Sequence, residues 1–181
     1  QALVELEKRG LVVRVANRGA HVRDFSDTEV RQIGEVREFL HAKAASIIPI
    51  PADAKLVERL KSAQQAHQNA VQARDLMAIH RTNTQFHNTL FAASGNDFLA
   101  QTIADYAALS LAFRCHLMAR TQYAERAVAE HRAMIEALEQ GDRETLVELC
   151  IQHTRPAEQV YRAIRGWVRD GEADLILAST G

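Results

Sequence analysis

The sequence predicts an all-α protein: a six-helix antiparallel bundle preceded by the end of a helix and a β-hairpin. The 181-residue chain contains only 8 Gly and 3 Pro, which favours long uninterrupted helices. From Ser26 onward, apolar residues recur at helical spacing. Cap residues and turn residues then divide this stretch into six segments joined by short turns, the pattern typical of a helical bundle.

The first 24 residues have a different pattern. Leu3, Val4 and Leu6 indicate the end of an amphipathic helix, with Gly10 at its C-terminal cap. Two β-like runs follow, over 11–15 and 20–22, and the turn from Asn17 to Gly19 joins them as in a hairpin. A helix followed by a compact hairpin predicts a wing-like unit.

The six helical segments have recognisable ends. Ser26 and Glu29 form a capping box, and the first segment stops near Ile48-Pro49. Pro156 lies inside the sixth segment and is expected to kink it beside His153. The expected segments are 26–48, 53–73, 75–93, 96–119, one that begins after Thr121 and ends at Gly141, and 142–170.

Composition narrows the function classes. The formal net charge of -1 gives no strong global attraction to nucleic acid, so a DNA-binding surface must be local or lie outside this chain. Cys115 and Cys150 fit a reducing compartment and are interpreted as inert core thiols. With no signal peptide and no apolar stretch long enough to span a bilayer, a cytoplasmic protein is the expectation. The chain opens inside what reads as a helix already under way, which predicts that it continues a larger protein.

Three of the eight histidines lie in phase with apolar residues on different predicted helices: His87, His131 and His153. One such histidine alone would be interpreted as a core residue with its hydrogen bonds satisfied. Three in one bundle favour a shared metal ion, because unpaired buried imidazoles are costly. Asn83 lies four residues before His87, hence on the same helical face, and can add a carbonyl oxygen ligand.

Arg37 is a charged residue in an unexpected position, because it falls on the apolar stripe of the first predicted helix. A guanidinium stays protonated, so a buried one needs an anion. Two interpretations stay open: an internal ion pair with a glutamate, or a fork that clamps a ligand carboxylate at two points. Arg114, in phase with Ala107 and Leu111, is a second candidate for the same role.

A metal-dependent hydrolase is the rival function class, since three histidines with an open coordination position can activate water. Against it, Glu130 adjoins His131 but is expected to point about 100° away around the helix, and no other acid is aimed at the site. A purely structural metal, or none, is the third possibility. His67 and His80 lie on polar stretches and are expected to be solvated.

These residues resemble the GntR superfamily of bacterial regulators, and within it the FadR-type branch with the all-helical FCD effector domain. LVELEKRGLVVRVANRGAHV resembles the end of the recognition helix and the wing of that family's winged helix-turn-helix. VREFLHAKAA resembles the opening helix of the effector domain, and FHNTLFAASGN and EHRAMIEALEQGDRETL resemble its most distinctive blocks. The resemblance covers nearly the whole chain.

The resemblance implies a winged-helix remnant over 1–24, an FCD effector domain over 25–170 and a flexible tail over 171–181. The family's metal ligands, an Asp or Asn with three histidines from three helices, map onto Asn83, His87, His131 and His153. Asn83 stands where aspartate is more usual, which removes one negative charge from the ligand set. The arginine of the first effector helix maps onto Arg37, and His41 stands where that helix often has glutamate.

The implied function is a homodimeric transcription regulator, expected to be a repressor, that senses a small carboxylate effector. Zinc or nickel, or another divalent ion that prefers imidazole, is the expected metal. Arg14 and Arg18 in the wing are candidates to contact phosphates or the minor groove of operator DNA. Solvated hairpin charges are the alternative interpretation of these two residues.

Overall fold

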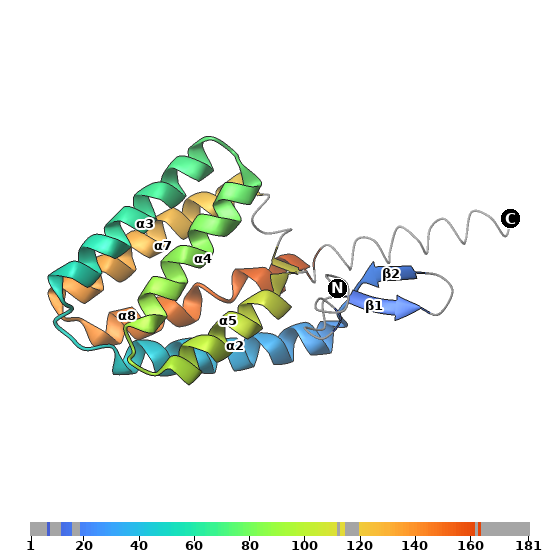
Figure 1. Ribbon diagram of the computed structural model, residues 1–181, viewed down its shortest axis with the longest axis horizontal. Helices are drawn as coiled ribbons and strands as arrows, with labels where there is room; N and C mark the ends of the chain where they lie inside the picture. The colour runs from blue at the N-terminus through green and yellow to red at the C-terminus, as the bar shows by residue number, and fades with distance from the viewer. Residues whose placement is uncertain are drawn as a thin grey trace, which may run out of the picture.

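The computed structural model describes residues 7, 12–15, 19–111, 113–114, 120–161 and 163. Within these residues, two strands precede six helices, which confirms the predicted all-α bundle with an N-terminal hairpin (Figure 1). No helix in the described ranges is both long enough and apolar enough to cross a bilayer. The elements are β1 (Val12–Val15), β2 (Gly19–Val22), α2 (Asp27–Ile47), α3 (Ala54–Gln72), α4 (Leu76–Ala92), α5 (Asp97–Leu109), α7 (Thr121–Gln140) and α8 (Arg143–Gln152).

The two strands form the predicted antiparallel hairpin. Val12 lies opposite Val22 and Val15 lies opposite Gly19. Gly19 has a φ of 87°, a left-handed conformation that a residue without a Cβ adopts readily, and it begins β2 directly after the turn. The expected helix end at 3–6, its cap Gly10 and the turn residues 16–18 lie outside the described residues.

The predicted helix ends are largely confirmed by side-chain caps. The Ser26 hydroxyl accepts a hydrogen bond from the Glu29 amide at 3.2 Å, and the Glu29 carboxylate accepts one from the Ser26 amide at 2.9 Å. This reciprocal pair satisfies amides that have no partner inside α2. α7 ends at Gly141 with a φ of 73°. The side chains of Asp53, Asp75, Asn96 and Asp142 cap α3, α4, α5 and α8.

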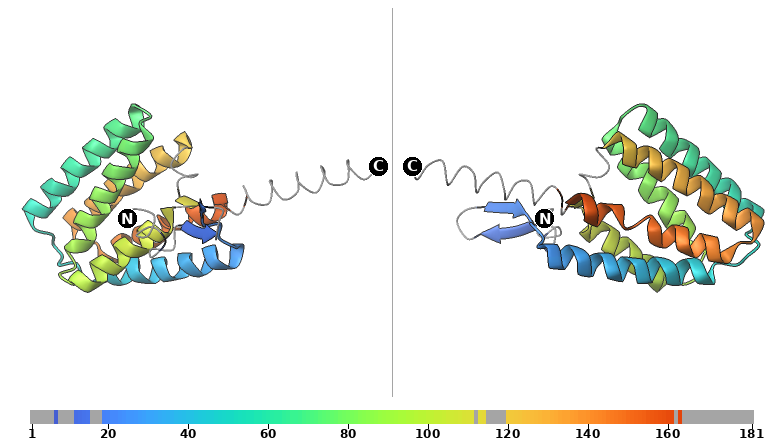
Figure 2. Two further views of the ribbon diagram at one scale, coloured as in Figure 1. Left: turned by 45° about the vertical axis from the view of Figure 1, so that its right-hand side comes forward. Right: turned by 180° about the vertical axis from the view of Figure 1, so that it is seen from behind.

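The helices pack as two groups. α3 packs against α4 and α7, whereas α2 packs against α8 and α5. Figure 2 shows these groups from two sides, with the hairpin beyond the N-terminal end of α2. Their shared core is fully buried and apolar, so burial of the amphipathic faces holds the bundle together. Its central side chains are Leu60, Phe86, Leu90, Met134, Leu138 and Leu146.

The fourth predicted helix is interrupted at Ser110. α5 ends at Leu109 with Ser110 as its C-cap, so the prediction of one continuous helix over 96–119 is wrong. Residues 111, 113 and 114 are helical again, and residues 115–119 lie outside the described residues. The Ser110 hydroxyl and Arg114 Nη1 both donate to the Ala107 carbonyl, at 3.0 and 3.2 Å. In a continuous helix that carbonyl would accept from the amide of residue 111. Side chains that bond back to the backbone in this way compete with the helix.

The sixth helix is interrupted rather than merely kinked. α8 ends at Gln152, residues 153–155 form a turn, and helical residues resume at Pro156. Proline has no amide proton and its ring crowds the carbonyl of the residue four positions earlier, which is Gln152. The break places His153 at the C-cap of α8. The expected end of this helix at 170 and the tail over 171–181 lie outside the described residues.

Candidate metal and anion site

Three histidines from three helices converge on one point. His87 Nε2 lies 3.0 Å from His153 Nε2 and 3.2 Å from His131 Nε2. Their candidate ligand atoms all lie within 4.8 Å of one another. His131 is fully buried, and the other two are half-buried. The structure therefore brings together the three imidazoles singled out in the sequence, although their role as metal ligands stays a prediction.

A glutamine fixes the orientation of His131. Gln64 Nε2 donates to the Val128 carbonyl at 2.9 Å, which identifies Gln64 Oε1 as the acceptor facing His131 Nδ1 at 3.0 Å. His131 Nδ1 must then carry the proton. The lone pair of this imidazole is left on Nε2, which faces His87.

A carboxylate fixes His153 in the same way. Glu130 Oε2 lies 2.6 Å from His153 Nδ1, and its other oxygen accepts a hydrogen bond from Arg126 Nε. The expectation that Glu130 points away from the site is therefore wrong. The angle around a helix describes where a side chain starts, whereas a glutamate is long enough to reach across to the end of the neighbouring α8. Burial raises the pKa of Glu130, but the hydrogen bonds from His153 and Arg126 outweigh it and hold that pKa below its ordinary value.

Asn83 lies one turn before His87 on α4. It is only 6% exposed and lines the same pocket as His87 and His153. Its amide oxygen is a neutral donor of the kind that accompanies imidazole in metal sites. Asn83 therefore lies in the wall of the same pocket, and its role as a metal ligand stays a prediction.

The chemistry of these donors fits a divalent cation. Burial, followed by the charge of His153, lowers the pKa values of His87 and His131 well below the ordinary value, so both rings are neutral at physiological pH, the form that binds metal. Metal–nitrogen bonds of about 2.1 Å place neighbouring ligand nitrogens roughly 3.0–3.4 Å apart, which matches the two Nε2 separations given above. Three imidazole nitrogens gathered at such distances offer donor atoms to one cation.

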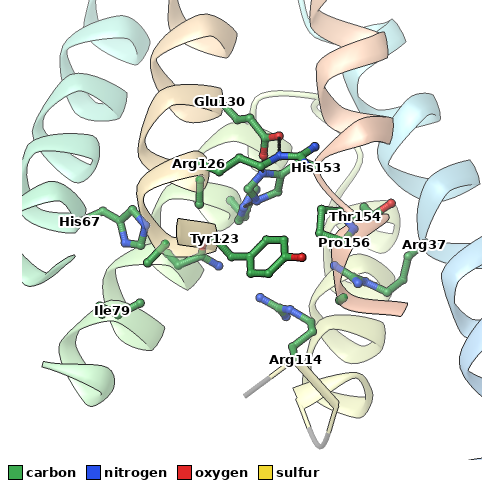
Figure 3. Close-up of a pocket in the computed structure, with 15 residues that line it drawn as sticks. Arg37, His67, Ile79, Arg114, Tyr123, Arg126, Glu130, His153, Thr154 and Pro156 are labelled. Carbon is green, nitrogen blue, oxygen red and sulfur yellow. Dashed lines mark hydrogen bonds and ion pairs between the residues drawn. The ribbon is translucent and has the colours of Figure 1, made fainter. Parts of the chain in front are cut away.

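His153, labelled in Figure 3, lies at one end of a pocket that His87 also lines. Tyr123 lies in the middle, and the guanidinium groups of Arg37 and Arg114 are directed toward it from the other end. The cavity has a volume of about 60 Å³ for the centres of water molecules, and since about 10–15 Å³ on this measure holds one water, it can take a small molecule.

Arg37 is 5% exposed, and its Nε has no hydrogen-bond partner among the described residues. Burial, followed by the charge of Arg114, lowers the pKa of Arg37 to about 9. Burial also lowers the pKa of Arg114 to about 10. In the part of the chain that the structure describes, no carboxylate pairs with Arg37, so the interpretation as an internal ion pair finds no partner there.

Residues 32–155 match the family model described as the FCD domain. The chain belongs to the FCD domain family. The matched range spans α2 to α8, and so includes every residue of the site described above. No curated protein sequence matches the chain.

Solved structures share the fold of this FCD protein. E. coli McbR/YncC superposes with a TM-score of 0.75 at 13% identity, over 90% of this chain and 82% of that chain. A putative GntR transcriptional regulator from Rhodococcus sp. RHA1 gives 0.75 at 16% identity, over 90% and 77%. A GntR family regulator from Pseudomonas syringae pv. tomato gives 0.59 at 21% identity, over 96% and 70%. The resemblance to the FCD domain is confirmed by the family model, and the fold of the chain is that of these regulators.

His67, in the FCD domain, is a further buried histidine, and sequence reasoning missed its burial. His67 is 1% exposed, its Nδ1 lies 3.0 Å from Thr82 Oγ1, and its ring centroid lies 5.1 Å from that of His131. The expectation that it is solvated is wrong. His67 follows Leu60 and Ala63 at helical spacing on the buried face of α3, and that periodicity was the available signal. His80, expected to be solvated as well, is half-buried.

The predicted DNA-binding residues lie in the hairpin. Arg14 is exposed on β1 and its Nε lies 3.4 Å from a carboxylate oxygen of Glu7. Arg18 lies outside the described residues. Their contact with DNA stays a prediction.

Proposed function

We propose that this FCD protein is a DNA-binding transcription regulator, a repressor, whose helical domain senses a small organic acid beside a bound metal ion. The observation that carries the proposal is a single pocket lined by His87 and His153, which converge with the buried His131, and also by the guanidinium groups of Arg37 and Arg114. Donor nitrogens for a metal and unneutralised cations for a carboxylate are the two elements that such a sensor needs.

Asn83, His87, His131 and His153 would hold the metal, with zinc or nickel preferred because imidazole suits both. When bound, the ion supplies positive charge and an open coordination position for a carboxylate oxygen. The chain's own residues prepare this arrangement before any ligand arrives. Gln64 and Glu130 hydrogen-bond to the Nδ1 atoms of His131 and His153. Such hydrogen bonds keep each imidazole ring in the orientation that metal coordination requires.

A small second core connects the pocket to the hairpin. Phe25, in the linker between β2 and α2, packs against Phe113 with ring centroids 5.9 Å apart. The Tyr161 hydroxyl donates to Asp24 at 2.6 Å and accepts from the Phe25 amide at 3.3 Å. Arg114, which lines the pocket, directly follows Phe113. A ligand that shifts Arg114 would therefore shift the residues that hold the linker, and so the hairpin.

A homodimer suits this function, because two copies can present two wings to a palindromic operator in the cytoplasm. Large apolar side chains support it on two helices that pack together: Phe39 on α2 is 71% exposed and Phe98 on α5 is 88% exposed. Exposed aromatic side chains at such a position favour burial against another protein surface. The proposed partner is a second copy of the chain.

The test begins with the full-length protein and a pool of random duplex DNA. Repeated selection should enrich a palindromic sequence, and a small organic acid should change the affinity for it. Removal of metal with a chelator should abolish that effect while DNA binding persists. Failure to enrich any sequence would overturn the regulator proposal.

The hydrolase alternative is tested separately. Both oxygens of Glu130 are engaged, by His153 and by Arg126, so this carboxylate serves to orient a ring. Turnover of ester, amide or phosphoester substrates by the metal-loaded protein, lost in His131→Ala, would favour the enzyme instead.

A further inference from the structure

We propose that the pocket is built for a small dianion, with one anionic group at the histidine end and the other held by Arg37 and Arg114. This inference rests on the proposed effector site and narrows its ligand to a chemical class. A monocarboxylate, by contrast, would neutralise only one end of the pocket.

The argument starts from the charges in the pocket wall. The charged residues that line it are Arg37, Arg114, Arg126 and Glu130. Glu130 accepts hydrogen bonds from Arg126 and His153, so its charge is already engaged. Two guanidinium groups remain, and Asn83, where an aspartate would have offset one of them, is neutral. In the part of the wall formed by described residues, two positive charges are therefore uncompensated before the charge of any metal ion is added.

The two remaining arginines lack the partners that buried cations need. Arg37 Nε has no partner among the described residues. Among the described residues, the Arg114 side chain makes one hydrogen bond, from Nη1 to the Ala107 carbonyl at 3.2 Å. A guanidinium has five N–H donors, so the described residues leave donors of both groups without a partner, and an anion could accept from them. Two like charges in a low-dielectric wall also repel each other, and an anion between them removes that repulsion.

Geometry then links the two ends. In Figure 3 the guanidinium groups and the His153–Glu130 end lie on opposite sides of the Tyr123 ring, within one pocket. A cavity of about 60 Å³ for water centres accepts a chain of only a few carbons. One molecule with two anionic groups should bind more tightly than two separate ions. Once the first group is bound, the second group is already held close to its own site. Short dicarboxylates and small phosphate species share this chemistry.

The experiment compares matched probes on the metal-loaded, full-length protein at constant ionic strength. Isothermal titration calorimetry is run with malonate, succinate and glutarate, with acetate, propionate and butyrate as the monoanionic counterparts, and with inorganic phosphate. We expect at least one dianion to bind more than tenfold more tightly than every monocarboxylate. A preference for a dicarboxylate supports the proposal, whereas a preference for inorganic phosphate, which carries both charges on one compact group, would show that the ligand does not span the pocket and would overturn it.

Variants identify the residues responsible. Arg37→Met and Arg114→Met should each remove the preference for the dianion, whereas Arg59→Met, at an exposed position on α3, should preserve it. Arg37→Lys keeps the charge without the two-pronged geometry and should retain part of the preference. Circular dichroism of each variant verifies its fold.

Equal affinity for mono- and dianions, no binding of any dianion, or a preference that survives in Arg37→Met and Arg114→Met would overturn the inference. These results are distinct from failure of the proposed function, which the DNA selection measures. If a monocarboxylate controls DNA binding, the dianion proposal is wrong and the regulator proposal is supported. If a dianion binds tightly but the protein selects no DNA sequence, the regulator proposal is wrong and the dianion proposal is supported.

Discussion

Replacing Arg37 by methionine should stabilise the ligand-free protein. The pKa of Arg37 falls from 12.5 to about 9, which at ~1.4 kcal/mol per tenfold change is a penalty of about 5 kcal/mol for keeping the guanidinium charged inside the folded protein at neutral pH. Relaxation and water reduce such penalties, and a methionine keeps most of the apolar stem, so we expect a net gain of roughly 2–4 kcal/mol. For a protein of this size that corresponds to a rise in Tm of roughly 4–16 °C.

Differential scanning calorimetry of dialysed protein in chloride buffer measures this change, with Arg59→Met as the matched control. Arg59 is exposed on α3, so its substitution should change the free energy of unfolding by less than about 0.5 kcal/mol. The sign of the effect decides the question. A lower Tm in Arg37→Met would show that Arg37 has a partner that stabilises the fold. Arg37 would then not be an unpaired cation available to a bound anion.

Three further substitutions or treatments test other parts of the site. Glu130→Gln should weaken metal affinity by about 10–100-fold, because it removes the negative charge that orients His153. Competition with a chromophoric chelator measures the affinity, and an unchanged affinity would contradict the role of Glu130 in orienting His153. Burial raises the pKa of the Cys150 thiol to about 12, so iodoacetamide at pH 8 should label it, as followed by mass spectrometry, only after unfolding; labelling of the native protein would show that the thiol is accessible. Tyr161→Phe removes the donor to Asp24 and should reduce the effector-dependent change in DNA affinity while calorimetric effector binding stays within about twofold; full retention of the DNA response would place the coupling elsewhere.

The helix ends were predictable because they depend on local chemistry. Ser26 and Glu29 satisfy each other's amides within three residues, and Gly141 stops α7 by adopting a left-handed conformation. The convergence of His87, His131 and His153 was also foreseen, since each shares a helical face with apolar residues and those faces must meet in the core. Local pattern and core packing point to the same answer for these features.

The features that were missed depend on contacts between elements. Glu130 reaches His153 only because α8 breaks beside α7, and no periodicity within α7 encodes where that break lies. His67 was misplaced for another reason: polar neighbours in the sequence hid its position on the buried face of α3. The environment of a polar side chain is set by the helix packed against it, and sequence spacing alone does not fix that helix.

Both departures from regular helix lie at the pocket, and this coincidence has a physical basis. A continuous fourth helix would direct the Ala107 carbonyl to a backbone amide, whereas in the structure it accepts from Ser110 and from Arg114, a pocket residue. A continuous sixth helix would keep His153 within its regular turns, whereas the break before Pro156 leaves His153 at a C-cap, facing Glu130 and His87. Regular helices with apolar faces close on one another and leave no room for a ligand. Interrupting two helices opens a space between them and turns polar groups toward that space. Positions where a predicted helix is broken are therefore the positions at which to look for a binding site.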